Sequence, residues 1–272
     1  MLAIALVSCG RVGFDPMADA MLGPWAPPTP LGVANTADDE EDVGGSSTGL
    51  ELYFGRRTGL NTKQLWVTTR AAATDAWNAP VLASVNDGTW ASSPRLSLDD
   101  LALYFESVRT GGAGGYDVWT ATRTAVDAPW SPPTNFAEIN TALDERWFSP
   151  CLGGRYLIVR GSDAAGTSDI YEGVIGGAPA QPVAELNDPA GQSSVYITPD
   201  CRTVFFWSSR SGNDELYTAT RPASDGAWSI PQRMTDFDTQ ASEQDPWMSA
   251  DGRMFVFASD RDGTMDLFIS TR

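Results

Sequence analysis

Short apolar and aromatic runs recur along the chain at nearly constant intervals. Each run is a triplet such as residues 52–54 or 103–105, and the five triplets end at Phe54, Phe105, Ile158, Phe206 and Phe257. Runs this short, bounded by turn residues, are typical of β-strands rather than helices. A period of about 50 residues indicates a repeat architecture in which each copy is one supersecondary unit.

Other motifs recur at similar distances from each triplet, and together they predict four strands per copy. An inner strand with a polar turn precedes it, clearest at residues 93–100 and 245–252, and a Ser-x-Arg turn follows it at 107–109, 208–210 and 259–261. A third strand comes next, at 64–66, 117–119, 169–171, 215–217 and 266–268. A Trp-x-x-Pro motif announces a fourth strand at Trp77, Trp130 and Trp228. We interpret these tryptophans, with Trp25, as structural anchors.

The fifth copy lacks a fourth strand, and the N-terminal segment supplies a match for it. Residues 25–29 resemble residues 130–134, and Asn35 follows Trp25 by the same interval as Asn140 follows Trp130. An N-terminal strand beside the last one would close a ring and remove open sheet edges. The prediction is all-β: a five-bladed β-propeller of four-stranded antiparallel blades over 25–272, with 1–24 as signal, lipobox and linker.

These motifs resemble the TolB-type WD40-like propeller repeat, in which an inner strand ending in Ser-Pro-Asp-Gly precedes an aromatic strand, Ser-x-Arg-x-Gly and Asp-Leu/Ile-Trp/Tyr. The resemblance covers about residues 25–272 and implies the propeller fold. Members of that family include periplasmic scaffolds, peptidase-associated propellers and other secreted proteins. The third copy departs most from this signature, because its turn at residues 150–153 differs and it lacks Trp-x-x-Pro. We interpret these differences as sequence drift rather than as a sign of a docking blade.

Composition narrows the functional classes. The chain has 18 basic and 35 acidic residues and a net charge of −17, which disfavours nucleic acid as a partner. It has no histidine, so it lacks the commonest general base. The three cysteines, Cys9, Cys151 and Cys201, do not have the CxxC spacing of a structural zinc site.

The N-terminus predicts export. Residues 2–7 are apolar, and residues 6–10 resemble a bacterial lipobox in which Cys9 would be lipidated, although no basic residue precedes it. The alternative is a buried strand with a chance cysteine. Export would make this a periplasmic, outer-membrane or cell-surface lipoprotein, in contact with the membrane only through its lipid anchor. In an oxidising compartment Cys151 and Cys201 could form a bridge between adjacent blades or remain free thiols.

Two sets of residues are candidates for a binding site. The connections that lead into the inner strands are acidic, so oxygen ligands at the channel mouth could hold Ca²⁺ or a basic partner; alternatively, they pair with the repeat arginines or are solvated. Large side chains on the inner strands form the second set, namely Arg95, Phe148, Tyr196 and Trp247. Such residues suit a peptide or sugar ligand, or pack between blades.

Three functions remain open. The first is a non-catalytic binding module: a monomeric scaffold that recognises an envelope protein segment or cell-wall glycan at the channel mouth, with no enzyme activity and no resident cofactor. The alternative is a carbohydrate-binding propeller or a glycoside hydrolase that uses two carboxylates among Asp42, Glu145 and Asp245. The third is a structural protein stabilised by a divalent cation, which a chelator would destabilise.

Overall fold

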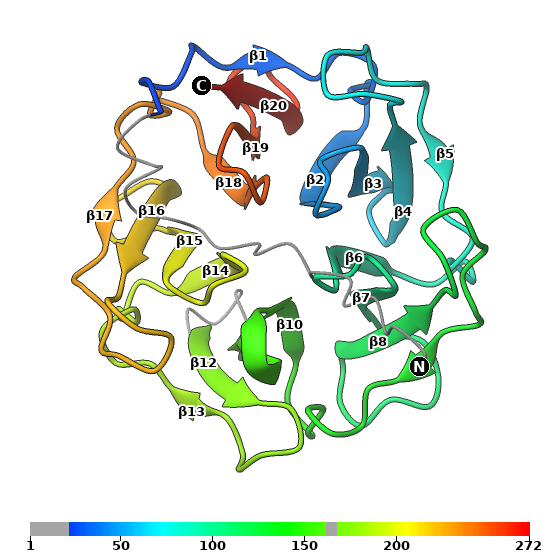
Figure 1. The fold of residues 1–272 in the computed structure, drawn as a ribbon, viewed down its shortest axis with the longest axis vertical. Coiled ribbons are helices and arrows are strands. Elements are labelled where there is room, and N and C mark those ends of the chain that lie inside the picture. The colour runs from blue at the N-terminus through cyan, green and yellow to red at the C-terminus, as the bar shows by residue number, and fades with distance from the viewer. Residues whose placement is uncertain (1–21, 162–167) are drawn as a thin grey trace, which may run out of the picture.

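The computed structural model describes residues 22–161 and 168–272. The described residues form five four-stranded antiparallel sheets arranged in a ring, with one strand of each sheet nearest the centre (Figure 1). The predicted all-β, five-bladed propeller is therefore confirmed.

Four of the blades are continuous in sequence, and their strands run from the centre of the ring outwards. The first blade contains β2 (Asp39–Gly45), β3 (Glu51–Gly59), β4 (Thr62–Thr69) and β5 (Val81–Leu82). The second contains β6 (Ala91–Leu96), β7 (Ala102–Ser107), β8 (Asp117–Thr122) and β9 (Thr134–Asn135). The third contains β10 (Glu145–Pro150), β11 (Arg155–Arg160), β12 (Asp169–Val174) and β13 (Gln181–Pro182), with a short 3-10 helix at Leu152–Gly154. The fourth contains β14 (Gln192–Ile197), β15 (Thr203–Ser208), β16 (Glu215–Thr220) and β17 (Gln232–Arg233).

The fifth blade joins the two ends of the described chain. It contains β18 (Glu243–Met248), β19 (Met254–Ser259) and β20 (Asp266–Thr271), and its outer strand is β1 (Thr29–Pro30). Figure 1 shows β1 lying along β20, and Thr29 pairs with Ile269 in antiparallel register. This pairing confirms that the N-terminal strand closes the ring and covers an edge that would otherwise be open.

A repeated contact between an arginine and a tryptophan fastens the outer part of four blades. The arginine follows the third strand, and its guanidinium lies 4.1 to 4.4 Å from the centre of a tryptophan ring. The pairs are Arg70 with Trp77, Arg123 with Trp130, Arg221 with Trp228, and Arg272 with Trp25. The last pair joins the two ends of the chain by the contact that the other blades make internally.

The third and fourth blades are also linked covalently. Cys151 and Cys201 form a disulfide with their Cα atoms 5.4 Å apart, between the turn after β10 and the turn after β14. Of the two alternatives for these cysteines, the structure has the bridge. Cys9 and the lipobox-like segment lie outside the described residues. Within the described ranges, no helix has the length and apolar character needed to cross a membrane.

Every inner strand contains a bulge at the same position. At each bulge the pairing with the second strand shifts register, and a residue other than glycine has a φ between 49° and 57°. These residues are Asp42, Ser93, Trp147, Ser194 and Asp245. A bulge turns the strand and re-aims a side chain, and it is these five residues that meet at the centre of the ring.

Candidate functional site

Asp42 is the centre of a buried hydrogen-bond network in the channel. Its Oδ1 accepts hydrogen bonds from Trp147 Nε1 at 3.0 Å and from Ser93 Oγ at 3.4 Å. Its Oδ2 accepts one from the ammonium group of Lys63. The carboxylate of the first blade is therefore bound to side chains of the second and third blades.

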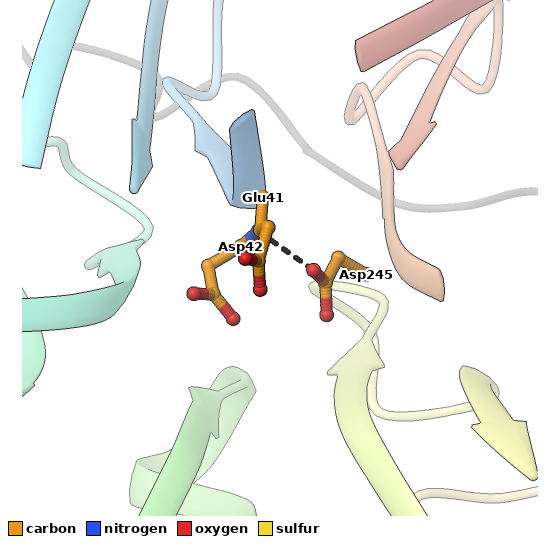
Figure 2. Close-up of side chains that lie close together, drawn as sticks. All are labelled: Glu41, Asp42 and Asp245. Atoms are coloured by element: carbon orange, nitrogen blue, oxygen red, sulfur yellow. Dashed lines mark hydrogen bonds between the residues drawn. The ribbon is translucent and has the colours of Figure 1, made fainter. Parts of the chain in front are cut away.

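Asp245 extends the same network to the remaining blades. Its Oδ2 accepts a hydrogen bond from the backbone N–H of Asp42 at 2.8 Å, drawn as a dashed line in Figure 2, and its Oδ1 accepts one from Ser194 Oγ. Because Asp42 and Asp245 are only 3% and 2% exposed, these bonds form away from bulk water. The bulge residues of all five inner strands are thus tied together at the axis.

Lys63, on β4, is the one lysine of the chain, and it lies among these carboxylates. Its ammonium is buried and bonds to Asp42 and, at 2.9 Å, to Glu41 Oε2. Burial opposes the charged forms, but the attraction between the opposite charges outweighs it, so the pKa of Lys63 is raised and that of Asp42 is lowered. Lys63 and Asp42 therefore form a stable internal ion pair.

Asp245 has the opposite protonation behaviour. Burial, together with the negative charges of Asp42 and Glu41, raises its pKa from the ordinary value of 3.8 to about 7. A protonated carboxyl beside an ionised one is the chemical requirement for acid–base hydrolysis of a glycoside. However, every oxygen of Asp42 and Asp245 already accepts a hydrogen bond from the protein.

Glu145, the third carboxylate candidate, is not part of this group. It begins β10, and its Oε1 accepts hydrogen bonds from Thr141 Oγ1 at 2.6 Å and Arg160 Nε at 3.0 Å. The same threonine–glutamate–arginine arrangement recurs at Glu40 and Glu243. Glu145 therefore braces the entry of an inner strand, and the structure pairs these acids with arginines of the repeat.

Two groups of three carboxylates bring oxygens within 4.8 Å of one another in the described residues: Glu41, Asp42 and Asp245; and Glu215, Asp238 and Glu243. Ca²⁺ takes six to eight oxygen ligands. In the first group, Lys63 already holds two of the carboxylates. In the second, Arg233 bonds to both Glu215 and Asp238. A protein cation thus occupies each group, and neither donor set fits calcium.

A cavity of about 480 Å³ opens at the end of the channel where the inner strands finish. Arg95, Tyr196 and Trp247 line it, so the structure brings together three of the four large inner-strand residues. Each inner strand begins at an acidic connection at the other end of the channel. The cavity and the acidic loops therefore lie on opposite faces of the ring. The rest of its wall is mostly apolar and includes Leu96, Leu98, Pro150, Leu152, Ile197, Pro199 and Met248.

Phe148 does not line this cavity. Its ring packs 4.9 Å from that of Tyr104 and 5.2 Å from that of Tyr156, between blades. The register of the sheets makes Ser149, which does line the cavity, the equivalent of Arg95 and Tyr196. Since successive residues of a strand face opposite sides, a shift of one position moves Phe148 from the channel into the packing between blades.

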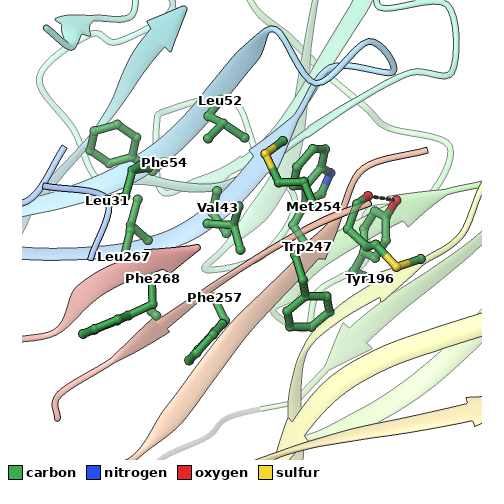
Figure 3. Packing of buried hydrophobic residues seen from close by; sticks show 14 of the residues in the cluster. Leu31, Val43, Leu52, Phe54, Tyr196, Trp247, Met254, Phe257, Leu267 and Phe268 are labelled. Carbon is green, nitrogen blue, oxygen red and sulfur yellow. Dashed lines mark hydrogen bonds between the residues drawn. The ribbon is translucent and has the colours of Figure 1, made fainter. Parts of the chain in front are cut away.

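Two glycines make room for the wall of the cavity. A Cβ atom on Gly44 would lie 2.0 Å from the carbonyl oxygen of Pro94, and one on Gly45 would lie 2.5 Å from the ring of Trp247. Gly44 occupies the position that Arg95 and Trp247 occupy in their own blades. Its lack of a side chain lets the first two blades approach closely. Trp247 and Tyr196 belong to the buried cluster shown in Figure 3.

Sequence reasoning did not identify Lys63 or Trp147 as channel residues. The signal for Lys63 was its uniqueness, since seventeen of the eighteen basic residues are arginine. Trp147 gave no signal. Its indole reaches the channel because β10 has a bulge at Trp147 itself, and tryptophan does not favour the positive φ of a bulge.

The fold and the channel define a five-bladed β-propeller, and comparisons with known proteins agree. Solved structures that match include a candidate TolB from Agrobacterium tumefaciens (18% identity, 85% of this chain and 76% of that one, TM-score 0.55). They also include an endo-arabinase from Bacteroides thetaiotaomicron (11%, 92% and 98%, 0.57) and an α-L-arabinofuranosidase from Podospora anserina in complex with cellotriose (14%, 89% and 94%, 0.59). No protein-family model matches the sequence, and no curated protein is similar enough to match. At these identities the likeness is one of fold, and it does not select the TolB type over the glycoside hydrolases.

Proposed function

We propose that this protein is a non-catalytic binding propeller of the cell envelope, which recognises a protein segment or cell-wall component in the cavity lined by Arg95, Tyr196 and Trp247. The observation that carries the proposal is the cavity itself. Its volume of about 480 Å³ is within the range of ligand sites, and its wall combines apolar surface with a few polar groups. The likeness of the repeat motifs to TolB-type propellers, whose members include periplasmic scaffolds, agrees with a binding role but is an analogy of fold.

The carboxylates of the channel support a structural role rather than hydrolysis. Asp42 and Asp245 hold the inner strands together, and their oxygens are occupied by Lys63, Trp147 and Ser194. A general acid must be able to reach the proton acceptor on its substrate. Catalysis here would require breaking the network that joins the blades.

An exported location agrees with the disulfide. Bridges such as that between Cys151 and Cys201 form and persist in oxidising compartments. Lipidation at Cys9 would add a membrane anchor, and mass spectrometry of the protein purified from membranes tests it: a diacylglyceryl-cysteine at the mature N-terminus is the expected result.

Binding to peptidoglycan fragments and envelope-derived peptides, measured by isothermal titration calorimetry, tests the binding function. Ala250 lies on the cavity wall, so Ala250→Trp should fill it and weaken binding at least tenfold. Leu60 is 94% exposed, so Leu60→Trp is the matched control and should bind normally. Binding that both variants retain, or no binding by the wild type, would contradict the proposal.

A glycoside hydrolase is the second candidate, since three observations favour it: the arabinan-active neighbours, the lowered pKa of Asp42 and the raised pKa of Asp245. Incubation with arabinan and aryl α-L-arabinofuranosides tests this activity. Product formation that Asp245→Asn abolishes, in a variant that melts normally, would establish hydrolysis and replace the binding proposal.

A further inference from the structure

Arg95 has an unsatisfied hydrogen-bonding edge. The side chain is 3% exposed, and its Nη1 donates to the carbonyl oxygens of Val43 at 2.6 Å and Pro94 at 2.9 Å. Its Nε and Nη2 are themselves buried and have no hydrogen-bond partner among the described residues, so a ligand in the cavity reaches them once the Arg95 side chain turns toward it. These two nitrogens lie on the same edge of the guanidinium plane, which is the edge that binds a carboxylate through two parallel hydrogen bonds.

The nearby acids do not fill this edge. Asp42 and Asp245 attract the guanidinium of Arg95 electrostatically, but their oxygens bond to other groups and neither forms an ion pair with it. By contrast, Arg160 directs its Nε to Glu145 and its Nη2 to the carbonyl oxygen of Ile139. A buried charged group with unmade hydrogen bonds is costly, so a ligand that completes them would gain affinity.

The wall of the cavity specifies the rest of the ligand. Arg95 is its one cationic residue and Asp99 its one acidic residue. Asp99 already accepts hydrogen bonds from Ser97 Oγ and the Leu101 N–H. Trp247 and Tyr196 contribute aromatic surface, with their ring centres 6.4 Å apart. A single guanidinium neutralises one negative charge, so in this apolar setting a planar carboxylate is fully paired whereas a doubly charged phosphate would keep an unpaired charge.

We propose that the cavity binds a carboxylic acid with an apolar body, its carboxylate paired with Nε and Nη2 of Arg95 and its body packed against Trp247 and Tyr196. This inference rests on the proposed binding function and names its ligand class. The carboxylate could belong to a free organic acid or to the C-terminus of a peptide, which present the same group to Arg95.

Calorimetry with matched probe pairs tests the carboxylate. The pairs are indole-3-propionic acid with its amide, octanoic acid with its amide, and a tetrapeptide ending in leucine with a free or amidated C-terminus. At least one acid should bind tenfold or more tightly than its amide, since a charge-assisted bidentate contact contributes more than a neutral one. The pair that shows the preference identifies the source.

Two variants assign the preference to the guanidinium. Arg95→Gln should remove it, and Arg95→Lys, which keeps the charge but not the two-pronged edge, should reduce it; Leu60→Trp should leave it unchanged. If Arg95→Gln does not fold, the acid-over-amide preference of the wild type and its reduction in Arg95→Lys still test the role of the guanidinium. Equal binding of acids and amides, lost in Ala250→Trp, would overturn the carboxylate proposal and leave the binding function intact. Absence of binding by every probe and by the envelope fragments would overturn both.

Discussion

The bulge residues show how one backbone position can serve different chemistry in each blade. Aspartate is enriched at positive φ and bulky residues are disfavoured there, and four of the five positions are small polar residues, Asp or Ser. Trp147 is the exception at φ 49°, and its indole N–H bonds to Asp42 across the channel. Strained backbone persists where surrounding contacts determine it, and this cross-channel bond is such a contact.

Lys63 should be essential to stability because it compensates Asp42 and Glu41 in the interior. Removing one partner of a buried ion pair leaves an unpaired charge and costs about 3–5 kcal/mol. We therefore expect Lys63→Ala to lower the free energy of unfolding by about this amount in urea titrations. Combining it with Asp42→Asn should recover part of the loss.

The control for this variant is Arg57→Ala. Arg57 also pairs with Glu41, but its side chain is 38% exposed, so its removal should cost less than about 1 kcal/mol. Equal losses for Lys63→Ala and Arg57→Ala would show that the channel charges are as well solvated as those at the surface.

Asp245 should make stability depend on pH. Because its pKa is raised from 3.8 to about 7 in the folded protein, the folded state retains a proton that the unfolded state has lost between these values. Its contribution to stability therefore falls as pH rises through this window and is constant above it. Asp245→Asn mimics the protonated group and should lack this fall, so it should gain stability relative to the wild type between pH 5 and pH 8 in urea titrations. A parallel pH dependence for the two proteins would show that Asp245 is ionised throughout.

At the scale of elements, strands were more predictable than the faces they present. The triplets and Trp-x-x-Pro motifs located all five blades, because short apolar runs and the turn residues that bound them are local signals. The bulges are not visible in that pattern, so the sequence places Phe148 in one set with Arg95, whereas the register of the sheets makes Ser149 the equivalent of Arg95. The network around Lys63 could not be predicted either, since it depends on inner strands from all five blades meeting at one point.

The disulfide adds a covalent link between two of these elements. It encloses a chain segment with a sequence separation of 50 residues, and the chain-entropy model for a loop of this length predicts a stabilisation of about 4 kcal/mol. Reduction, or replacement of both Cys151 and Cys201 by serine, should lower the free energy of unfolding by this amount. The serine variant should not respond to reductant; if the wild type does not respond either, the bridge does not contribute to stability.

At the scale of the whole molecule, stability depends on the joining of distant segments. Trp25 packs against Phe237, in the connection between the fourth and fifth blades, and against Phe255 of the fifth blade, with ring centres 5.9 and 5.7 Å away, and stacks on Arg272. Leu31 is also buried, and its N–H bonds to the carbonyl oxygen of Leu267. The N-terminal segment is thus part of the core rather than an appendage to it.

A chain that begins at residue 37 should therefore be much less stable than one that begins at residue 22, which keeps Trp25, Leu31 and β1. Each large core side chain that is lost costs about 3–5 kcal/mol, so we expect the melting temperature to fall by at least about 10 °C. The truncated chain would also expose the free edge of β20, and an open edge favours pairing with other chains. Size-exclusion chromatography should then show oligomers for the shorter chain and a monomer for the longer one. Equal melting temperatures and monomeric behaviour of both would mean that the other four blades hold the ring together without this closure.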